Sequence, residues 1–336
     1  MLRPFTWDDK ETVLKIASDN DTTKYLYHWG RVGSTPEGDT QTFLSRAVSG
    51  WEQTPVMARE YAVVLKETGE VMGDGSIEDF GNGVGEIGWI LLPEYRGKGY
   101  VTEMGKAFLQ YGFETLGLQK IIANCDARNE KSRRVMERLM MEKSNIAYAV
   151  RPAKERDGFP GDEFTYVITK EQYEGWQEAA QIAQSPCEFH GFMDLPDLTD
   201  GELRLICHKK SPYDPVTKYV PAYFFYMTVG SEVVGTCDLR VGYVPGLYVG
   251  GNIGYDVNEA YRGRGYAGRA CKLLLPVMRY HKMKIALITN NVTNLSSRRV
   301  CEKLGLRFLR QMDVPMENDM YKQGIRRVNI FAMEDK

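Results

Sequence analysis

The alternation of apolar and polar positions along the 336-residue chain occurs twice. In the first half, an apolar run at 85–92 precedes a glycine-rich turn, a segment with apolar residues at helical spacing, and a second apolar run at 121–125. The second half repeats this order between 249 and 308. Each half is therefore predicted to contain a strand, a turn, a helix, a second strand, a second turn and a second helix.

The helices of this repeat are predicted from individual positions. Apolar residues recur at helical spacing after both glycine turns, at Val101, Met104, Ala107, Phe108 and Tyr111, and again at Ala267, Ala270, Cys271, Leu274 and Val277. Pro276 should kink the helix of the second copy. Asn129 and Asn294 stand where the next helix needs an N-cap.

Strand signals flank each copy. Two hairpins are expected before the copies, with turns at Thr68-Gly69 and Gly230-Ser231, and late strands are expected within 162–173 and 321–334. A strand, a helix and a further strand at this spacing imply a parallel pair in each half. We thus expect an α/β chain with mixed sheets, duplicated in tandem, with domains at 1–175 and 190–336 and a linker at 176–189 that could form a connecting helix.

Composition excludes several classes of protein. A net charge of -2 gives no general attraction for nucleic acid, and basic pairs such as Arg133-Arg134 and Arg326-Arg327 are more typical of solvated faces. Neither a signal peptide nor a membrane-spanning run is evident, so a cytoplasmic protein is expected. The cysteines are too dispersed for zinc or a disulfide framework and fit a reducing compartment; they are Cys125, Cys187, Cys207, Cys237, Cys271 and Cys301.

The duplicated turn indicates an anion site. YRGKGY at 95–100 and YRGRGY at 261–266 each lie between a strand and a helix, where glycines leave backbone N–H groups open at the positive end of the helix dipole. A tight turn that merely needs glycine is the alternative, which two copies in matching context make weaker. The second copy also fits the G-x-G-x-x-G pattern of dinucleotide folds, but no acidic residue ends the following strand, so that reading is rejected.

With N-x-x-S-R-R-V at 129–135 and 294–300, these turns resemble the acyl-CoA-binding core of GNAT N-acetyltransferases. LRPF, EIGW and DEFTYVIT make the first half similar to ribosomal-protein alanine N-acetyltransferases, and GGNIGYDV makes the second half similar to another GNAT group. The resemblance implies two tandem GNAT folds that use acetyl-CoA. The cofactor residues it implies are Leu91, Leu92, Arg96, Gly97, Lys98, Gly99, Tyr100, Val101, Asn129, Ser132, Val257, Asn258, Arg262, Gly263, Arg264, Gly265, Tyr266, Ala267, Asn294 and Ser297.

Acetyl transfer to an amine needs a general base and a proton for the leaving thiolate. The resemblance implies Glu86 as the candidate base, because it lies on the strand before the first loop, where family members often place one; a structural carboxylate is the alternative. The matching position holds Asn252, so Asp256, on the same strand face, is a substitute. The tyrosine that many GNAT enzymes use as acid is replaced by Met136 and Cys301, which leaves Ser132 or Ser297 to supply a hydroxyl.

Two classes of function follow from these residues. The preferred one is an enzyme that acetylates a primary amine of a small molecule or of a peptide or protein N-terminus; the alternative is an acyl-CoA-binding or sensing protein without turnover. The acceptor stays open, although Asp74, Glu78 and Asp79 could attract a cationic amine. Neither metal, membrane nor nucleic acid is expected as a partner, and the chain could be a monomer or a homodimer.

Overall fold

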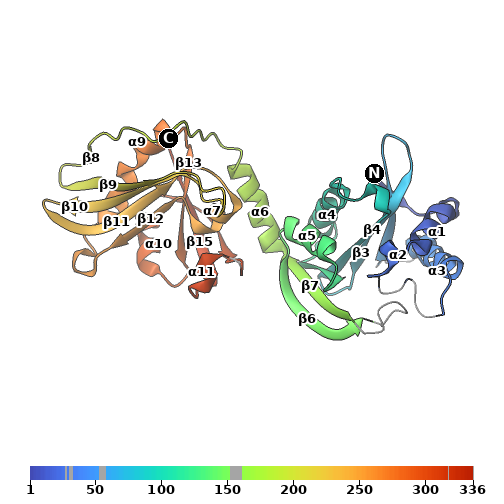
Figure 1. The fold of residues 1–336 in the computed structure, drawn as a ribbon. Helices are drawn as coiled ribbons and strands as arrows, with labels where there is room; N and C mark the ends of the chain where they lie inside the picture. The colour runs from blue at the N-terminus through green and yellow to red at the C-terminus, as the bar shows by residue number, and fades with distance from the viewer. Residues whose placement is uncertain (27–28, 30–32, 53–57, 152–160, 317, 336) are drawn as a thin grey trace. The chain divides into compact units, whose positions relative to one another are not determined.

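The computed structural model describes residues 1–26, 29, 33–52, 58–151, 161–316 and 318–335, which divide into two compact units, Met1–Tyr173 and Glu174–Lys336 (Figure 1). The N-terminal unit contains β1 Leu2–Pro4, η1 Trp7–Asp9, α1 Lys10–Ser18, α2 Asn20–Thr23, α3 Pro36–Ser49, η2 Gly50–Glu52, β2 Ala58–Val64, β3 Val71–Asp79, β4 Val84–Leu91, η3 Pro93–Tyr95, α4 Tyr100–Gln110, η4 Tyr111–Thr115, β5 Lys120–Asp126, α5 Glu130–Arg138, β6 Glu142–Arg151 and β7 Gly161–Thr169. Helix α6, Lys170–Ile182, crosses the division and forms the helix expected between the halves.

A seven-stranded mixed sheet with the order β1-β2-β3-β4-β5-β7-β6 forms the centre of the N-terminal unit. Its strands pair antiparallel except β4 and β5, which form the predicted parallel pair. That pairing covers only Val84 to Glu86 against Lys120 to Ile122, so the two strands separate beyond Glu86. The sheet is therefore continuous at one end of β4 and open at the other.

The two faces of this sheet are covered by different helices. A Cβ atom on Gly75 would collide with Met104 and Phe108, so α4 packs on that face of β3. Ala62 and Ile90, on the opposite face by strand register, join the core formed with α1 and α3. Figure 1 shows the same arrangement, with α1 to α3 on one side of β3 and β4, and α4 and α5 on the other.

In the C-terminal unit the strands form two sheets. The elements are β8 Leu198–Thr199, β9 Leu203–Ser211, β10 Ala222–Val229, β11 Glu232–Arg240, α7 Pro245–Gly250, β12 Ile253–Val257, η5 Glu259–Tyr261, α8 Tyr266–Leu273, α9 Leu275–Tyr280, β13 Ile285–Asn291, α10 Leu295–Lys303, β14 Arg307–Asp313, α11 Asp319–Lys322 and β15 Arg327–Glu334. The orders are β12-β11-β10-β9-β8 and β13-β15-β14. The prediction of a parallel pair is thus wrong here, because β12 and β13 form no ladder.

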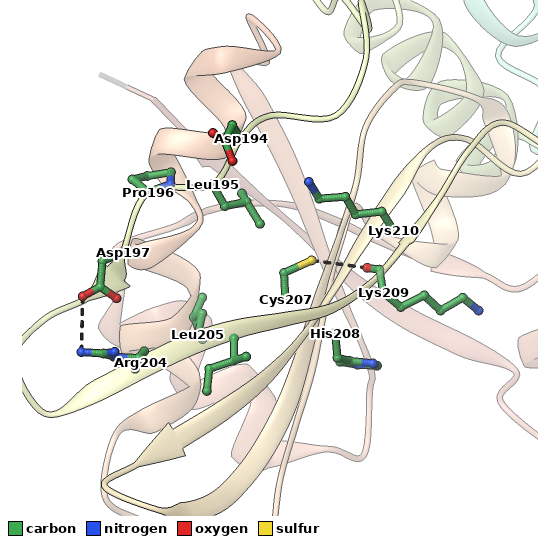
Figure 2. Close-up of a pocket in the computed structure, with 11 residues that line it drawn as sticks. Asp194, Leu195, Pro196, Asp197, Arg204, Leu205, Cys207, His208, Lys209 and Lys210 are labelled. Atoms are coloured by element: carbon green, nitrogen blue, oxygen red, sulfur yellow. Dashed lines mark hydrogen bonds and ion pairs between the residues drawn. The ribbon is translucent and has the colours of Figure 1, made fainter.

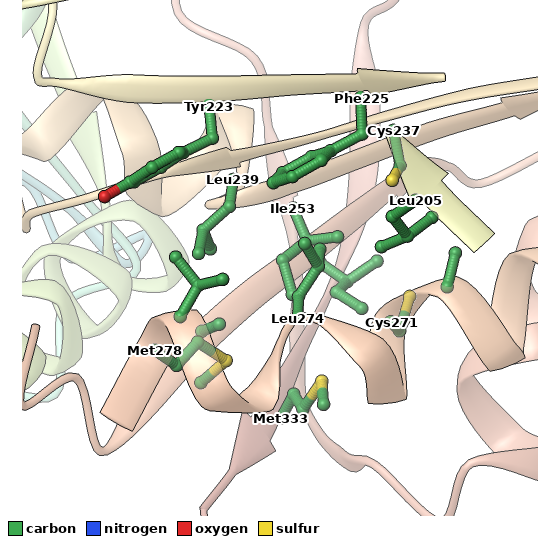
Figure 3. Close-up of a cluster of buried hydrophobic side chains, with 14 of the residues drawn as sticks. Leu205, Tyr223, Phe225, Cys237, Leu239, Ile253, Cys271, Leu274, Met278 and Met333 are labelled. Carbon is green, nitrogen blue, oxygen red and sulfur yellow. The ribbon is translucent and has the colours of Figure 1, made fainter. Parts of the chain in front are cut away.

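The core of the C-terminal unit fills the space between these sheets and α8 and α9. Tyr223, Phe225 and Leu239 from one sheet face Leu274 and Met278 from the helices (Figure 3). Pro276 has a stronger effect than the predicted kink, since the helix is interrupted at Leu274 and α9 begins with the proline in its first turn.

Candidate active site

Both glycine loops have the same backbone conformation. Gly97 and Gly99 have φ values of 77° and 88°, and Gly263 and Gly265 have values of 80° and 81°. Only glycine adopts this left-handed region without strain. A Cβ atom added at any of the four would meet nothing within 4 Å, so open space lies beside each glycine.

These loops present a row of available backbone donors. Gly99 and Gly265 are the N-caps of α4 and α8, and neither provides a side-chain cap. Across the described chain, no residue accepts a hydrogen bond from the backbone N–H groups of residues 97–102 or 263–268. Unpaired N–H groups at the positive end of a helix, beside open space, suit a phosphate oxygen. The geometry therefore fits the pyrophosphate of acetyl-CoA in both units.

The first arginine of each loop holds the loop itself. Arg96 donates from Nε to the Leu91 carbonyl at 2.8 Å and from its terminal nitrogen to Thr22 Oγ1 at 2.5 Å. Arg262 donates in the same way to the Val257 carbonyl at 3.0 Å. The two Nε contacts join each loop to the end of the preceding strand, and the contact with Thr22 joins the first loop to α2.

The second basic residue of each loop lies over an aromatic ring. Lys98 Nζ is 5.8 Å from the centre of the Tyr95 ring, and the guanidinium carbon of Arg264 is 5.4 Å from that of Tyr261. Because a cation over a ring face keeps its N–H donors, Lys98 and Arg264 are the loop cations best able to contact a bound phosphate.

The open edge of β4 offers backbone groups beside the loop. Leu92 donates its N–H to Met72, which fixes the ladder so that alternate residues bond to β3. The N–H and C=O groups of Trp89 consequently point toward the side that β5 has left. In β12, the Asn258 N–H donates to the Val234 carbonyl. By the same alternation, the backbone N–H and C=O groups of Tyr255 point away from β11. Among the strand-end residues that the sequence predicted to bind the cofactor, Leu92 and Asn258 use their N–H groups within the protein. The backbone groups of Trp89 and Tyr255, which lie earlier in each strand, are the ones that point toward the opening.

The two asparagines after the second strand are helix caps. Asn129 Oδ1 accepts from the Ser132 N–H at 3.2 Å and Asn294 Oδ1 accepts from the Ser297 N–H at 3.1 Å, with nearly equal backbone angles. The predicted capping is confirmed. It uses Oδ1 alone, and among the described residues neither amide nitrogen donates a hydrogen bond.

Glu86 lies at the point where β4 and β5 separate. Its Oε1 accepts a hydrogen bond from Asn124 Nδ2 at 3.1 Å, and Asn124 Oδ1 accepts from Thr165 Oγ1 at 2.7 Å. The carboxylate is half-buried and opposite Glu78 of β3. A carboxylate at the point where the two strands separate is a candidate to accept a proton.

Asn252 takes the place of Glu86 in the C-terminal unit and has a structural role. It is fully buried. Its Nδ2 donates to the carbonyls of Arg240 and Gly242, its Oδ1 accepts from the Leu287 N–H at 3.0 Å, and its own N–H donates to the Leu287 carbonyl. This amide joins the two sheets at the point from which β12 and β13 diverge.

Replacing Asn252 with alanine should lower the free energy of unfolding of the C-terminal unit by about 3 kcal/mol, because two acceptors and one donor lose their partners inside the protein. Denaturant titration measures the change. Asn258→Ala is the control, since its exposed amide makes one bond, to Val233, and surface changes cost within about 0.5 kcal/mol. Equal losses in both variants would contradict the role given to Asn252.

Asp256 does not join the other candidate residues. Its side chain is 79% exposed and lies 3.9 Å from Arg262. Because successive side chains on a strand point to opposite faces, Asp256 and Tyr255 lie on different sides of β12. The exposure of Asp256 and its distance from Arg262 are those of a surface ion pair.

Sequence reasoning missed Tyr255. Its hydroxyl is 2.9 Å from Ser297 Oγ, so a tyrosine of β12 contacts α10. In many GNAT enzymes the helix itself carries the tyrosine, at the position that Cys301 occupies in this chain. Burial raises the pKa of Tyr255 far above its usual value and that of Cys301 to about 11, and both groups therefore stay protonated at neutral pH. The first half has Trp89 and Met136 at these positions.

A separate recess of about 660 Å³ lies along β9 in the C-terminal unit (Figure 2). None of its lining residues belongs to a glycine loop. Its charged groups are used locally, since Arg204 pairs with Asp197 at 3.3 Å and Lys210 Nζ donates to the Met193 carbonyl at 2.9 Å. This recess is distinct from the candidate active sites.

Comparison with known proteins points to the same family as the two glycine loops. The chain matches the acetyltransferase (GNAT) domain model over residues 1–142 and 213–307. Over 52% of its length it is 29% identical to the uncharacterized N-acetyltransferase YnaD of Bacillus subtilis, covering 95% of that protein. Among the helices that the structure describes, none is long and apolar enough to cross a membrane.

Solved structures of the same kind are similar to about half of the chain. A GNAT-family acetyltransferase from Bacillus anthracis is 31% identical, with 51% of this chain and 94% of that one covered and a TM-score of 0.43. A spermidine N-acetyltransferase from Vibrio cholerae, in complex with CoA and spermine, is 16% identical, with 52% and 97% covered and a TM-score of 0.44. The family-model match spans segments of both units, and the chain belongs to the GNAT acetyltransferase family, which uses acetyl-CoA.

Proposed function

We propose that the chain is an N-acetyltransferase that transfers the acetyl group of acetyl-CoA to a primary amine of a small molecule or of a peptide N-terminus. The duplicated glycine loop carries this proposal, because both copies combine the same φ values with unpaired backbone N–H groups. We further propose that each half is a GNAT domain, at 1–175 and 190–336, and that each binds one acetyl-CoA.

The chemistry belongs to the N-terminal unit in this proposal. When bound, acetyl-CoA supplies an activated thioester. The backbone N–H groups of 97–102 hold its pyrophosphate, with Lys98 adding a positive charge, and the open edge of β4 at Trp89 pairs with the pantetheine arm. Glu86 takes the proton from the attacking amine, directly or through a water molecule. Ser132, at the start of α5, is the hydroxyl proposed to relay a proton from a solvent water molecule to the leaving thiolate, accepting one proton as it donates the other.

The C-terminal unit is proposed to bind acetyl-CoA in the same way, through 263–268 and Arg264. The Asn252 amide cannot act as a base, and the residue is engaged in five hydrogen bonds, which favours binding without turnover in this half. Tyr255 and Ser297 would then contact the acyl end of the cofactor and act as neutral donors. A chain with one catalytic and one binding unit combines the two functions that the sequence left open.

Release of free thiol from acetyl-CoA, measured with a thiol reagent while primary amines are added, tests the proposed function. We expect release that requires both amine and protein and that rises with pH as the amine loses its proton, with the acetylated amine identified by mass spectrometry. Binding of acetyl-CoA without release for any amine would favour the acyl-CoA-binding alternative. The proposal also places the enzyme in the cytoplasm, since reduced cysteines persist there.

A further inference from the structure

A segment without helix or strand, residues 187–197, leads from α6 to β8 in the C-terminal unit. We call it the strap. Four of its side chains pack against the core of this unit and are only partly buried, namely Cys187, Phe192, Met193 and Leu195. Because partly buried side chains contribute little to local stability, the polar contacts of the strap decide whether it stays in place.

His281 holds the strap at two points. The imidazole is fully buried and follows the last residue of α9. Its Nδ1 is 3.1 Å from the carbonyl oxygen of Glu188, and its Nε2 is 2.7 Å from the hydroxyl of Tyr223. That hydroxyl accepts a hydrogen bond from the Met193 N–H at 2.7 Å. The Glu188 N–H also donates to the His281 carbonyl at 2.8 Å. One ring thus ties both ends of the stretch from Glu188 to Met193 to the body of the unit.

These contacts fit only the neutral imidazole that carries its hydrogen on Nδ1. A carbonyl oxygen accepts and never donates, so the hydrogen between His281 and Glu188 belongs to Nδ1. Nε2 then has a lone pair that accepts from the Tyr223 O–H, and the Tyr223 oxygen accepts from Met193. A proton on Nε2 would leave the hydroxyl hydrogen of Tyr223 without an acceptor inside the protein, which is costly.

Aromatic rings enclose the imidazole. Phe189 of the strap stacks on the His281 ring with the centroids 5.3 Å apart, and Tyr280 meets the same ring at 90°. Phe192 of the strap packs edge-on against Tyr223 at 5.1 Å. Such surroundings disfavour a charge, and burial lowers the pKa of His281 below its usual value. The closed strap therefore keeps the ring out of water and neutral.

No ion pair offsets a charge on this ring. The titratable groups around the ring and its two partners are Tyr223 of β10, Lys210 of β9, Tyr280 of α9, Lys282 after α9, and Glu188 and His190 of the strap. The Glu188 carboxylate is engaged by Lys282 Nζ at 2.7 Å and by His190 Nε2 at 2.9 Å. The nitrogens of His281 bond instead to a carbonyl and a hydroxyl, neither of which is charged.

We propose that the strap is a pH-sensitive closure: neutral His281 holds residues 187–197 against the C-terminal unit, and a proton on the ring releases them. In the released form the ring is hydrated and can hold its charge. Opening also removes one wall of the recess along β9, because residues 194–197 line it (Figure 2). This inference concerns the C-terminal unit alone and does not depend on acetyl transfer.

The sign of the pH effect follows from the lowered pKa of His281. Above about 6.5, the ordinary pKa of histidine, the ring is neutral whether the strap is open or closed, so pH has no effect through this group. Below that value the open form takes up a proton that the closed form does not. The ratio of open to closed strap then rises up to about tenfold for each pH unit, until the pKa of the closed form is reached.

Hydrogen–deuterium exchange of backbone amides tests this in the whole chain. The N–H groups of Glu188 and Met193 are hydrogen-bonded to His281 and Tyr223, so their exchange, corrected for the intrinsic rate at each pH, reports opening. From about pH 7.5 to about pH 5.5 we expect their protection to fall about five- to tenfold, while the amides of β10 and β11 keep theirs. Unchanged protection of the strap, or an equal loss in these strands through global unfolding, overturns the proposal.

Two variants assign the effect to His281. Glutamine does not titrate, so strap protection in His281→Gln should be independent of pH; a thermal melt verifies that this variant folds. His190→Gln is the matched control, because His190 is also a histidine of the strap but is exposed. A charge on His190 strengthens its surface pair with Glu188 and opposes release weakly, so the pH dependence should remain in this variant. An effect that survives in His281→Gln, or disappears in His190→Gln, contradicts the assignment.

Tyr223→Phe keeps the test conclusive if His281→Gln does not fold. It removes the hydroxyl that donates to Nε2 and that accepts from Met193. A hydrogen bond to the neutral ring disfavours the charged one, so its loss should raise the pKa of His281 and move release to higher pH. Proton NMR of the imidazole, assigned by comparison with His190→Gln, measures that pKa. The same midpoint in wild type and Tyr223→Phe would show that the hydroxyl does not hold the ring neutral, and the proposed closure would be refuted.

Discussion

Acetyl-CoA binding by the N-terminal unit is expected to weaken about a hundredfold when Gly99 is replaced by glutamate, and Gly265→Glu should do the same in the C-terminal unit. Both glycines have left-handed φ values, and a side chain at either position projects into open space beside the free N–H groups. Glutamate there puts a negative charge where the pyrophosphate would lie, and like charges that close repel one another. Calorimetric titration with acetyl-CoA should therefore show two sites in wild type and one in each variant.

Backbone strain alone has to be separated from this charge effect. The chain offers matched positions for the purpose, since Gly69 and Gly230 lie in hairpin turns, have φ values of 76° and 58°, and also face open space. Gly69→Glu and Gly230→Glu carry a comparable strain and the same charge away from the loops, so both should keep two sites. Gly99→Ala, with strain but without charge, should lie between wild type and Gly99→Glu.

The number of sites decides how the halves are assigned. If wild type shows one site and only one glutamate variant abolishes it, that variant identifies the loop that binds acetyl-CoA. The other unit has then kept the loop conformation but does not bind acetyl-CoA. If no binding occurs, the positive φ values and open N–H groups are features of a tight turn alone, and the proposed cofactor sites are refuted in both halves.

The sequence predicted the parts of the fold whose signals are local. The strand at β4, the α4 and α8 helices, the hairpin turns at Gly69 and Gly230 and the caps at Asn129 and Asn294 are all confirmed, because spacing, glycine and cap chemistry act over a few residues. β6 was not predicted: its polar sequence, EKSNIAYAVR, has no clear alternation, and the strand is stabilised by pairing with β7.

The features that failed depend on contacts between distant segments. The missing ladder between β12 and β13 follows from Asn252, whose side chain bonds to Leu287 and to two carbonyls and so takes positions that a ladder would use. The contact of Tyr255 with Ser297 requires the placement of α10 against β12. Asp74 was noted as an acidic residue, but only the register shows that it shares a face with Glu60 and Glu86.

Turnover should fall about a hundredfold in Glu86→Gln at neutral pH, while affinity for acetyl-CoA stays within about twofold. Glutamine keeps an oxygen that can accept the Asn124 hydrogen bond, so the side chain retains its place at the separation of β4 and β5. What it loses is the ability to take a proton. An amine acceptor is mostly protonated at neutral pH, and without a base only its small neutral fraction reacts.

The pH profile distinguishes this role from a structural one. As pH approaches the pKa of the acceptor amine, deprotonation no longer needs Glu86, so the deficit of Glu86→Gln relative to wild type should shrink steadily. A merely structural carboxylate would give a deficit that is independent of pH, with a loss of acetyl-CoA affinity or of thermal stability. Glu67→Gln, an exposed control in the turn between β2 and β3, should match wild type throughout. Full turnover by Glu86→Gln at neutral pH would show that the proton leaves by another route and would refute Glu86 as the base.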